Sequence, residues 1–195
     1  MITSNDNAHH SQSSIERQTE TERETEMSRE SDADAKRWLE RVSSSSSPDG
    51  GDPDLKGIAQ AAWQGSNFSP LFLYGLRVSF VSHGRALCSI RVPPHLTDIE
   101  GNWQPGPIAL LIDMVSAAAI MSCEDTIKVS VDLNISFFSP AKIGEEMEIE
   151  ALVLQNKGKL TGAVIEVRKK TDRNLVAVGR QWMTSSSARP FESKL

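Results

Sequence analysis

The sequence contains few of the residues that build disulfide frameworks and metal centres. Its 2 cysteines, Cys88 and Cys123, lie among apolar neighbours, so we expect reduced core residues and no disulfide framework. Of its 4 histidines, two are adjacent near the N-terminus and two, His83 and His95, are isolated. None has the spacing of metal ligands, so we expect no metal site.

Other absences exclude whole classes of function. There is no Gly-rich loop of the kind that binds phosphate, and no basic stripe interleaved with aromatic residues, so no nucleic-acid interface is indicated. The longest apolar run, residues 107–121, is interrupted by Asp113 and is shorter than the roughly 20 residues that span a bilayer. The acidic N-terminal region is also unlike a transit peptide, which is rich in Arg and poor in acids.

Charge divides the chain into two parts. Residues 1–53 carry 12 acidic and 6 basic residues, whereas the remainder carries 14 and 15, so the net charge of -5 belongs to the N-terminal part. Such a segment buries too little apolar surface to offset the entropy of ordering it. We therefore expect residues 1–53 to be a disordered, acidic, Ser-rich extension. Its Glu/Arg spacing allows transient helix, with weak docking through Trp38, Leu39 and Val42.

Residues 54–184 have the patterns of one folded domain. Residues 55–65 read as a short helix closed by Gly65, and two alternating segments around His83-Gly84 read as a hairpin. A helix is predicted from Pro107 to about Met121, because proline suits the first helical turn. This helix is apolar on nearly every side, so other parts of the protein must surround it.

Four further strands follow that helix. The most regular alternation, in "IKVSVDLNISFF", places six apolar residues inward: Ile127, Val129, Val131, Leu133, Ile135 and Phe137. Residues 145–155, 160–170 and 175–183 read as three antiparallel strands joined by turns. A sheet that covers an apolar helix must curl around it, so the predicted fold class is α+β, with a curved antiparallel sheet around one central helix. This is the hotdog fold.

Three stretches in order also carry a family resemblance: "GNWQPGPIALLIDMVSAAAI", "VSVDLNISFFSPAKIGEEMEIEA" and "KKTDRNLVAVGRQ". From about Gly75 to Trp182 the chain resembles the small acyl-CoA thioesterases of the hotdog superfamily, the phenylacetate-pathway-like group. The plant peroxisomal and mammalian small thioesterases are nearest. The resemblance implies hydrolysis of an acyl-CoA to a carboxylic acid and coenzyme A, with no metal or organic cofactor. It also implies a homodimer or homotetramer with the site at the dimer interface.

The resemblance assigns site residues. The family's helix carboxylate falls on Asp113, which would act as general base on water or as nucleophile, and a serine that helps to place the water falls on Ser130. A loop Asn of the family falls on Asp98. A lone carboxylate on an apolar helix independently suggests a general base. The alternative is a buried Asp that is satisfied by a hydroxyl group, from Ser116 or Ser130.

The chain departs from the family at the start of this helix, where His-Gly-Gly is replaced by Gln104-Pro105-Gly106. In the family the first glycine donates its N–H to the thioester oxygen, and Pro105 has no N–H. Losing one such donor costs about 100- to 1000-fold in turnover. Gly106 or the Gln104 amide are the candidate replacements, and an acyl-CoA-binding protein without activity is the alternative function. A hotdog dehydratase or hydratase is disfavoured, because it needs a catalytic His that neither isolated histidine supplies.

Two sets of residues relate to coenzyme A and to targeting. Four basic residues are placed to meet the phosphates of coenzyme A or, equally, to form a solvated strand-end cluster: Arg168, Lys169, Lys170 and Arg180. The chain ends in Ser193-Lys194-Leu195, a peroxisomal import signal, on a flexible polar tail over residues 185–195. We therefore expect a peroxisomal protein that binds the import receptor, in a compartment where acyl-CoA esters are made and consumed.

Overall fold

The computed structural model describes residues 6–43, 69–123, 128–157 and 159–185, with side chains described except at 6–24 and 155–157. The elements are α1 (Asp6–Ser43), α3 (Ser69–Leu73), β1 (Arg77–Ser82), β2 (Arg85–Arg91), η1 (Pro94–Leu96), α4 (Pro105–Met121), β3 (Lys128–Phe137), β4 (Glu146–Lys157), β5 (Leu160–Lys169) and β6 (Leu175–Ser185). The helix predicted over 55–65, the turn at Gly158 and residues 186–195 lie outside the described residues.

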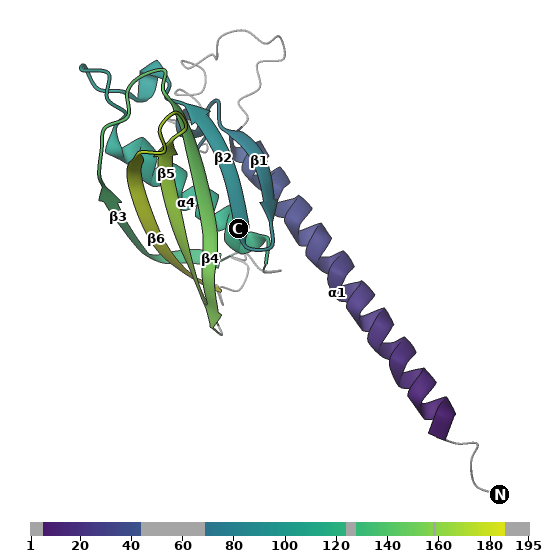
Figure 1. Ribbon diagram of the computed structural model, residues 1–195. Helices are drawn as coiled ribbons and strands as arrows, with labels where there is room; N and C mark the ends of the chain where they lie inside the picture. The colour runs from purple at the N-terminus through teal and green to yellow at the C-terminus, as the bar shows by residue number, and fades with distance from the viewer. Residues whose placement is uncertain (1–5, 44–68, 124–127, 158, 186–195) are drawn as a thin grey trace, which may run out of the picture.

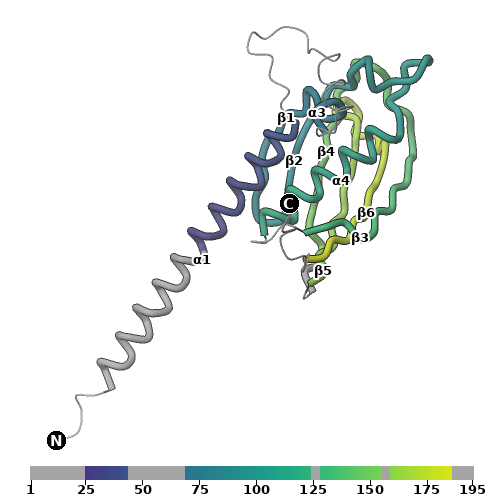
Figure 2. The backbone as a smooth tube through the Cα atoms, turned by 180° about the vertical axis from the view of Figure 1, so that it is seen from behind, coloured from purple at the N-terminus to yellow at the C-terminus, as the bar shows by residue number. Residues whose placement is uncertain are grey.

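The six strands form one antiparallel sheet in the order β1-β2-β4-β5-β6-β3, and α4 lies along one face of it (Figures 1 and 2). The core lies between them: Leu111, Ile112 and Val115 of α4 are fully buried, as are Ile149 of β4 and Ile165 of β5. Each such side chain contributes about 1.5–3 kcal/mol relative to its exposed state. The predicted hotdog arrangement is confirmed.

Helix α4 begins two residues earlier than predicted, at Pro105, with Gln104 as its N-cap. Pro105 and Pro107 both lie in the first turn, where a missing N–H removes no helical hydrogen bond. One side of α4 packs against the sheet, whereas Asp113, Ala117 and Met121 are only half-buried. These residues are four and eight positions apart, so they share one partly open face of the helix.

Strand β3 differs from its predicted pattern. The pairing with β6 shifts between Ser130 and Asp132, which marks a β-bulge. A bulge adds one residue to a strand and reverses which side chains face inward. Lys128 is therefore 5% exposed, and Val129 and Val131 are 47% and 55% exposed. The inward assignment of these two valines was wrong.

Beyond the bulge the predicted inward orientation of Leu133 and Ile135 is confirmed, because both residues pair with buried positions of β6. β3 is nevertheless an edge strand, so Leu133 and Phe137 remain 37% and 48% exposed in the single chain. A similar bulge between Val78 and Phe80 turns Val81 of β1 inward.

The N-terminal region also differs from the expected disordered extension. Residues 6–43 form α1, whose C-terminal part packs against β1, α3 and α4. Ala35 and Leu39 are fully buried, and Trp38 and Val42 pack against the core. These positions are three to four residues apart, so a short apolar stripe suffices to dock a helix whose other faces are charged.

The structure bears on the expected absence of a metal site and of a membrane-spanning helix only for the described residues. In the described ranges no three His, Cys, Asp or Glu side chains are grouped so that they would hold a metal ion, and no helix is long and apolar enough to cross a bilayer. Cys88 is buried, and burial raises the pKa of its thiol to about 12. Cys123 is exposed at the end of α4, so its assignment to the core was wrong.

Candidate active site on the open face of helix α4

Asp113 lies in the middle of α4 on its half-buried face, with its carboxylate oriented toward the edge of the sheet. Its Oδ1 atom accepts hydrogen bonds from the Ser130 hydroxyl of β3, at 2.9 Å, and from the Gln181 side-chain amide of β6. Among the described residues no donor reaches the other oxygen, Oδ2. One carboxylate oxygen is thus held in place and the other is free to accept a proton.

Ser130 reaches Asp113 because of the bulge in β3. The shift in pairing after Ser130 turns this residue toward α4, against the regular alternation of the strand. Its Oγ atom also accepts a hydrogen bond from Gln181 Nε2 at 2.6 Å. The structure therefore brings together the two residues that the family resemblance assigned to the base and the water.

Gln181 is the site residue that the sequence analysis missed. It is fully buried, its Nε2 donates to Asp113 and Ser130, and its Oε1 accepts from the Ser116 hydroxyl. A polar residue at an inward position of a strand must find partners. The alternation in "VAVGRQWM" places Gln181 inward with Met183, and that was the signal available in the sequence.

Asp98 is used differently from Asp113. Its carboxylate caps a turn between η1 and α4: Oδ1 accepts the N–H groups of Glu100 and Asn102, and Oδ2 accepts the Asn102 side-chain amide at 3.0 Å. These bonds, chiefly those from Asn102, lower the pKa of Asp98. An ionised carboxylate has no proton to donate, so Asp98 acts in this turn as an acceptor that holds the loop. Among the described residues no hydrogen bond joins Asp98 to Asp113.

The start of α4 contains an unusual set of donors. Pro105 and Pro107 have no N–H, and the N–H of Ile108 already bonds to the Gln104 carbonyl at 3.4 Å. Gly106 is exposed and therefore supplies the one available N–H of the described first turn. The Gln104 amide donates to the Thr97 carbonyl at 3.0 Å, which ties it to the preceding loop.

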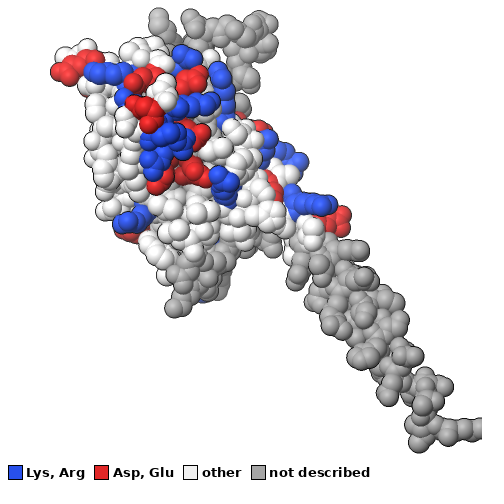
Figure 3. All heavy atoms as spheres, in the orientation of Figure 1, with Lys and Arg blue, Asp and Glu red and all other residues white. Residues whose placement is uncertain are grey.

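Three of the four basic residues predicted to meet coenzyme A form ion pairs with acidic residues, and Figure 3 shows positive and negative side chains intermixed on the face that it draws. Arg168 pairs with Glu166 at 2.8 Å, Lys169 with Glu145 at 3.0 Å, and Lys170 with Glu146 at 3.8 Å. Arg180, on β6, is exposed. The three paired residues thus have the solvated charge-cluster arrangement, which leaves Arg180 as the basic residue of this set most open to a phosphate.

Comparison with known proteins gives consistent matches. A family model described as the thioesterase superfamily matches residues 101–176, which include α4, β3, β4 and β5. Acyl-coenzyme A thioesterase 13 of Homo sapiens is 31% identical over 127 residues, which are 65% of this chain and 90% of that protein. The mouse protein of the same name is 38% identical over 97 residues, 49% of this chain and 69% of that protein.

A solved structure matches as well. The chain is similar to zebra fish thioesterase superfamily member 2, with a TM-score of 0.59, 32% identity, and coverage of 68% of this chain and 98% of that one. Helix α1 lies outside the residues that the family model matches.

Proposed function

The chain belongs to the thioesterase superfamily, and from this premise we propose that it hydrolyses acyl-CoA thioesters to a carboxylic acid and coenzyme A, with Asp113 as the general base. One observation carries the assignment of the base. Ser130 and Gln181 both donate to Oδ1 of Asp113, while no donor from the described residues reaches Oδ2.

The geometry supports a direct hydrolysis. Asp113 Oδ2 takes a proton from a water molecule, and the water oxygen forms a bond to the thioester carbonyl carbon. The carbonyl oxygen becomes negatively charged, then the carbon–sulfur bond breaks and the thiolate of coenzyme A takes the proton from Asp113. General-base assistance of this kind contributes about 100- to 10,000-fold.

The negative charge on the carbonyl oxygen needs a donor, and Gly106 is the candidate that we favour. Its N–H is exposed at the positive end of α4, between two prolines that hold the backbone in a helical conformation. The Gln104 amide is bonded to Thr97 and is therefore the second choice. Pro105 removes the donor that the family uses, but its neighbour keeps one.

A second copy of the chain completes the proposed site. The family resemblance implies a site at a dimer interface, so we propose that Gly106 of a second copy serves Asp113. The exposed apolar residues of the edge strand β3 support such pairing, because an exposed apolar edge favours association with another strand. Trp182 and Leu152, exposed on the outer face of the sheet, support further pairing into a tetramer.

Thiol release from a panel of short, medium, long and aromatic acyl-CoA esters tests the activity, with Asp113→Asn as the comparison. The Asn side chain keeps the shape and the Oδ1 acceptor but cannot take a proton, so release falls at least 100-fold. Substrate binding by the variant should be retained. Equal release by both proteins would remove Asp113 from the mechanism.

The alternative is an acyl-CoA-binding protein without turnover, and the observation that favours it is Pro105. Titration of acyl-CoA against the wild-type protein separates the two functions, since binding without release from any ester indicates the binding protein. Gly106→Pro provides a matched variant, because it removes the available N–H of the turn and would lower turnover in the enzyme about 100- to 1000-fold.

We also propose that Ser193-Lys194-Leu195 directs the protein to peroxisomes, although these residues lie outside the described part. Acyl-CoA hydrolysis suits a compartment that makes and consumes these esters. A fluorescent protein fused to the N-terminus should show peroxisomal localisation in the form that ends at Leu195 and diffuse localisation in the form without that residue. Unchanged localisation would overturn this assignment.

A further inference from the structure

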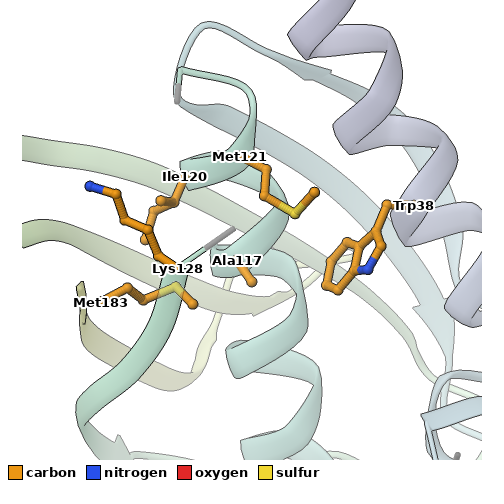
Figure 4. A pocket seen from close by; sticks show the side chains of 6 residues that line it. All are labelled: Trp38, Ala117, Ile120, Met121, Lys128 and Met183. Atoms are coloured by element: carbon orange, nitrogen blue, oxygen red, sulfur yellow. The ribbon is translucent and has the colours of Figure 1, made fainter. Parts of the chain in front are cut away.

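A cavity of about 50 Å³ lies near the C-terminal end of α4, between α1, β3 and β6 (Figure 4). It is lined by Trp38, Ala117, Ile120, Met121, Lys128 and Met183.

Helix α4 places this cavity in line with the proposed base. Ala117 and Met121 follow Asp113 by one and two turns, and all three are half-buried on the same face. With a rise of about 1.5 Å per residue, Ala117 lies roughly 6 Å and Met121 roughly 12 Å further along the helix axis.

The two neighbouring strands repeat the same relation. Side chains two positions apart lie on one face of a strand. On β3, Ser130 lies at the base and Lys128 at the cavity; on β6, Gln181 lies at the base and Met183 at the cavity. Three elements therefore run together from the reactive end of the site into the cavity.

The walls of the cavity are apolar. Met183, Met121 and Ala117 carry no charge, and Lys128 contributes its hydrocarbon chain, because its Nζ atom points away from the cavity and donates to Thr161 Oγ1 at 2.5 Å (Figure 4). Such a lining accepts a hydrocarbon group and offers no partner for a charged one.

Trp38 closes the cavity from α1. Its helix is fixed beside it by the buried Ala35 and Leu39, and by a 2.7 Å hydrogen bond from the Ser31 hydroxyl to the Met121 carbonyl. Helix α1 lies outside residues 101–176, which the thioesterase family model matches, so this wall of the cavity is not part of the region shared with that family model.

We propose that the cavity receives the end of the acyl chain and that Trp38 sets the longest chain that fits, an inference that rests on the proposed thioesterase function. The cavity has about a third of the roughly 150 Å³ that holds a benzene ring, which is room for about two carbon atoms. A chain that reaches it from Asp113 spans roughly 12 Å. Since an extended hydrocarbon chain zigzags and advances somewhat less than its carbon–carbon bond length of about 1.5 Å per carbon, the preferred acyl group has roughly eight to ten carbons.

Two substitutions on opposite walls test this inference, with kcat/KM measured for acetyl-, butanoyl-, octanoyl-, dodecanoyl- and hexadecanoyl-CoA. Trp38→Ala removes the end wall, so the hexadecanoyl-to-octanoyl ratio of kcat/KM rises about tenfold or more. Ala117→Leu fills the cavity, so the octanoyl-to-butanoyl ratio falls about tenfold or more. Met27→Ala is the control: Met27 lies at an exposed position of α1, the helix that carries Trp38, and its substitution leaves both ratios unchanged.

The opposite directions separate chain selection from a general loss of structure, because detachment of α1 cannot reproduce the effect of Ala117→Leu. Profiles of both variants that superimpose on that of the wild-type protein would overturn the inference while leaving the proposed function intact. If the wild-type protein releases no thiol from any ester, the inference is tested by binding: Kd values for thioether analogues of the same chain lengths are measured for the wild-type protein and both variants. The same shifts in Kd would support the inference although the proposed function had failed, and unshifted Kd values would overturn both.

Discussion

Asp113 accepts hydrogen bonds from Ser130 and Gln181 on one carboxylate oxygen, and in the proposed mechanism the other oxygen takes a proton from water. Gln181 is itself held by the Ser116 hydroxyl, so a chain of hydrogen bonds fixes the orientation of the carboxylate. Such preorganisation matters for a general base, because its reactive oxygen must meet the water at hydrogen-bond distance.

Gln181→Leu tests this positioning role. Leucine has a similar size but cannot donate, so Asp113 loses one of its two fixed contacts and kcat should fall about 10- to 100-fold. KM should change by less than about threefold, since Gln181 touches the base and not the acyl chain. Steady-state kinetics measure both constants, and a change confined to KM would assign Gln181 to substrate binding.

Asp98 allows a prediction of how the stability of the protein depends on pH. Its pKa is lowered in the folded protein, chiefly by hydrogen bonds from Asn102, so its contribution to stability is fully present above the unfolded pKa of about 3.9 and is lost as the pH falls through the folded pKa. The difference in the free energy of unfolding between the wild-type protein and Asp98→Ala should be constant from pH 7 to 5 and shrink below about pH 4. Urea unfolding at several pH values measures it. A difference that grows in acid would contradict the assigned role of the carboxylate.

Among the structural elements, α1 is attached to the body by polar contacts as well as by its apolar stripe. Asp32 accepts hydrogen bonds from the N–H of His83, at 2.8 Å, and from the Ser82 hydroxyl, at 2.7 Å. His83 and Gly84 have φ values of +48° and +76°, the left-handed pair of a tight hairpin turn. One carboxylate of α1 thus holds the turn between β1 and β2.

Asp32→Ala should loosen α1 by about 1–3 kcal/mol, because two donors lose a largely buried acceptor. Faster hydrogen exchange over residues 25–43 would report the change, as would a selectivity shift toward longer acyl chains like that of Trp38→Ala. Asp34→Ala is the matched control, since among the described residues Asp34 forms an ion pair only with the exposed Arg37. Equal exchange in both variants would mean that the apolar stripe alone holds the helix.

The elements also show what the sequence allowed us to predict. The strands and α4 follow from local periodicity, and the alternation of Ala86, Cys88 and Ile90 matches their burial. The bulge at Ser130 could not be predicted from local periodicity, because it depends on how β3 pairs with β6. It turns Val129 and Val131, which were predicted to face inward, toward the outside. The docking of α1 through Trp38, Leu39 and Val42 was expected, but only as a weak contact of a disordered segment. The composition of the segment is dominated by charge, whereas its attachment depends on a few residues, Ala35 and Leu39 among them.

For the whole molecule, the apolar residues that the single chain leaves exposed on β3 are the main argument for assembly. Val131→Asp places a charge at a position that is 55% exposed, so the fold should tolerate it. A dimer that pairs through this edge would bury that charge and dissociate. Light scattering should give a dimer or larger species for the wild-type protein and a monomer for the variant, with activity reduced about 100-fold or more for lack of the partner's Gly106.

Ile99→Asp is the control for that experiment, because Ile99 is fully exposed in the loop before α4 and lies outside β3. It should remain assembled and active. A Val131→Asp monomer with full activity would show that each chain contains a complete site.

The two prolines that flank Gly106 have a spectroscopic consequence. A chain labelled with ¹⁵N only at glycine gives amide signals from its 12 glycines, and Gly106 alone among them lies in the first turn of α4. Since Pro105 and Pro107 give no amide signal, the Gly106 resonance would report on the start of that turn without signals from either neighbour. Its chemical shift on addition of a ligand that mimics the anionic transition state would show directly whether this protein has an oxyanion hole.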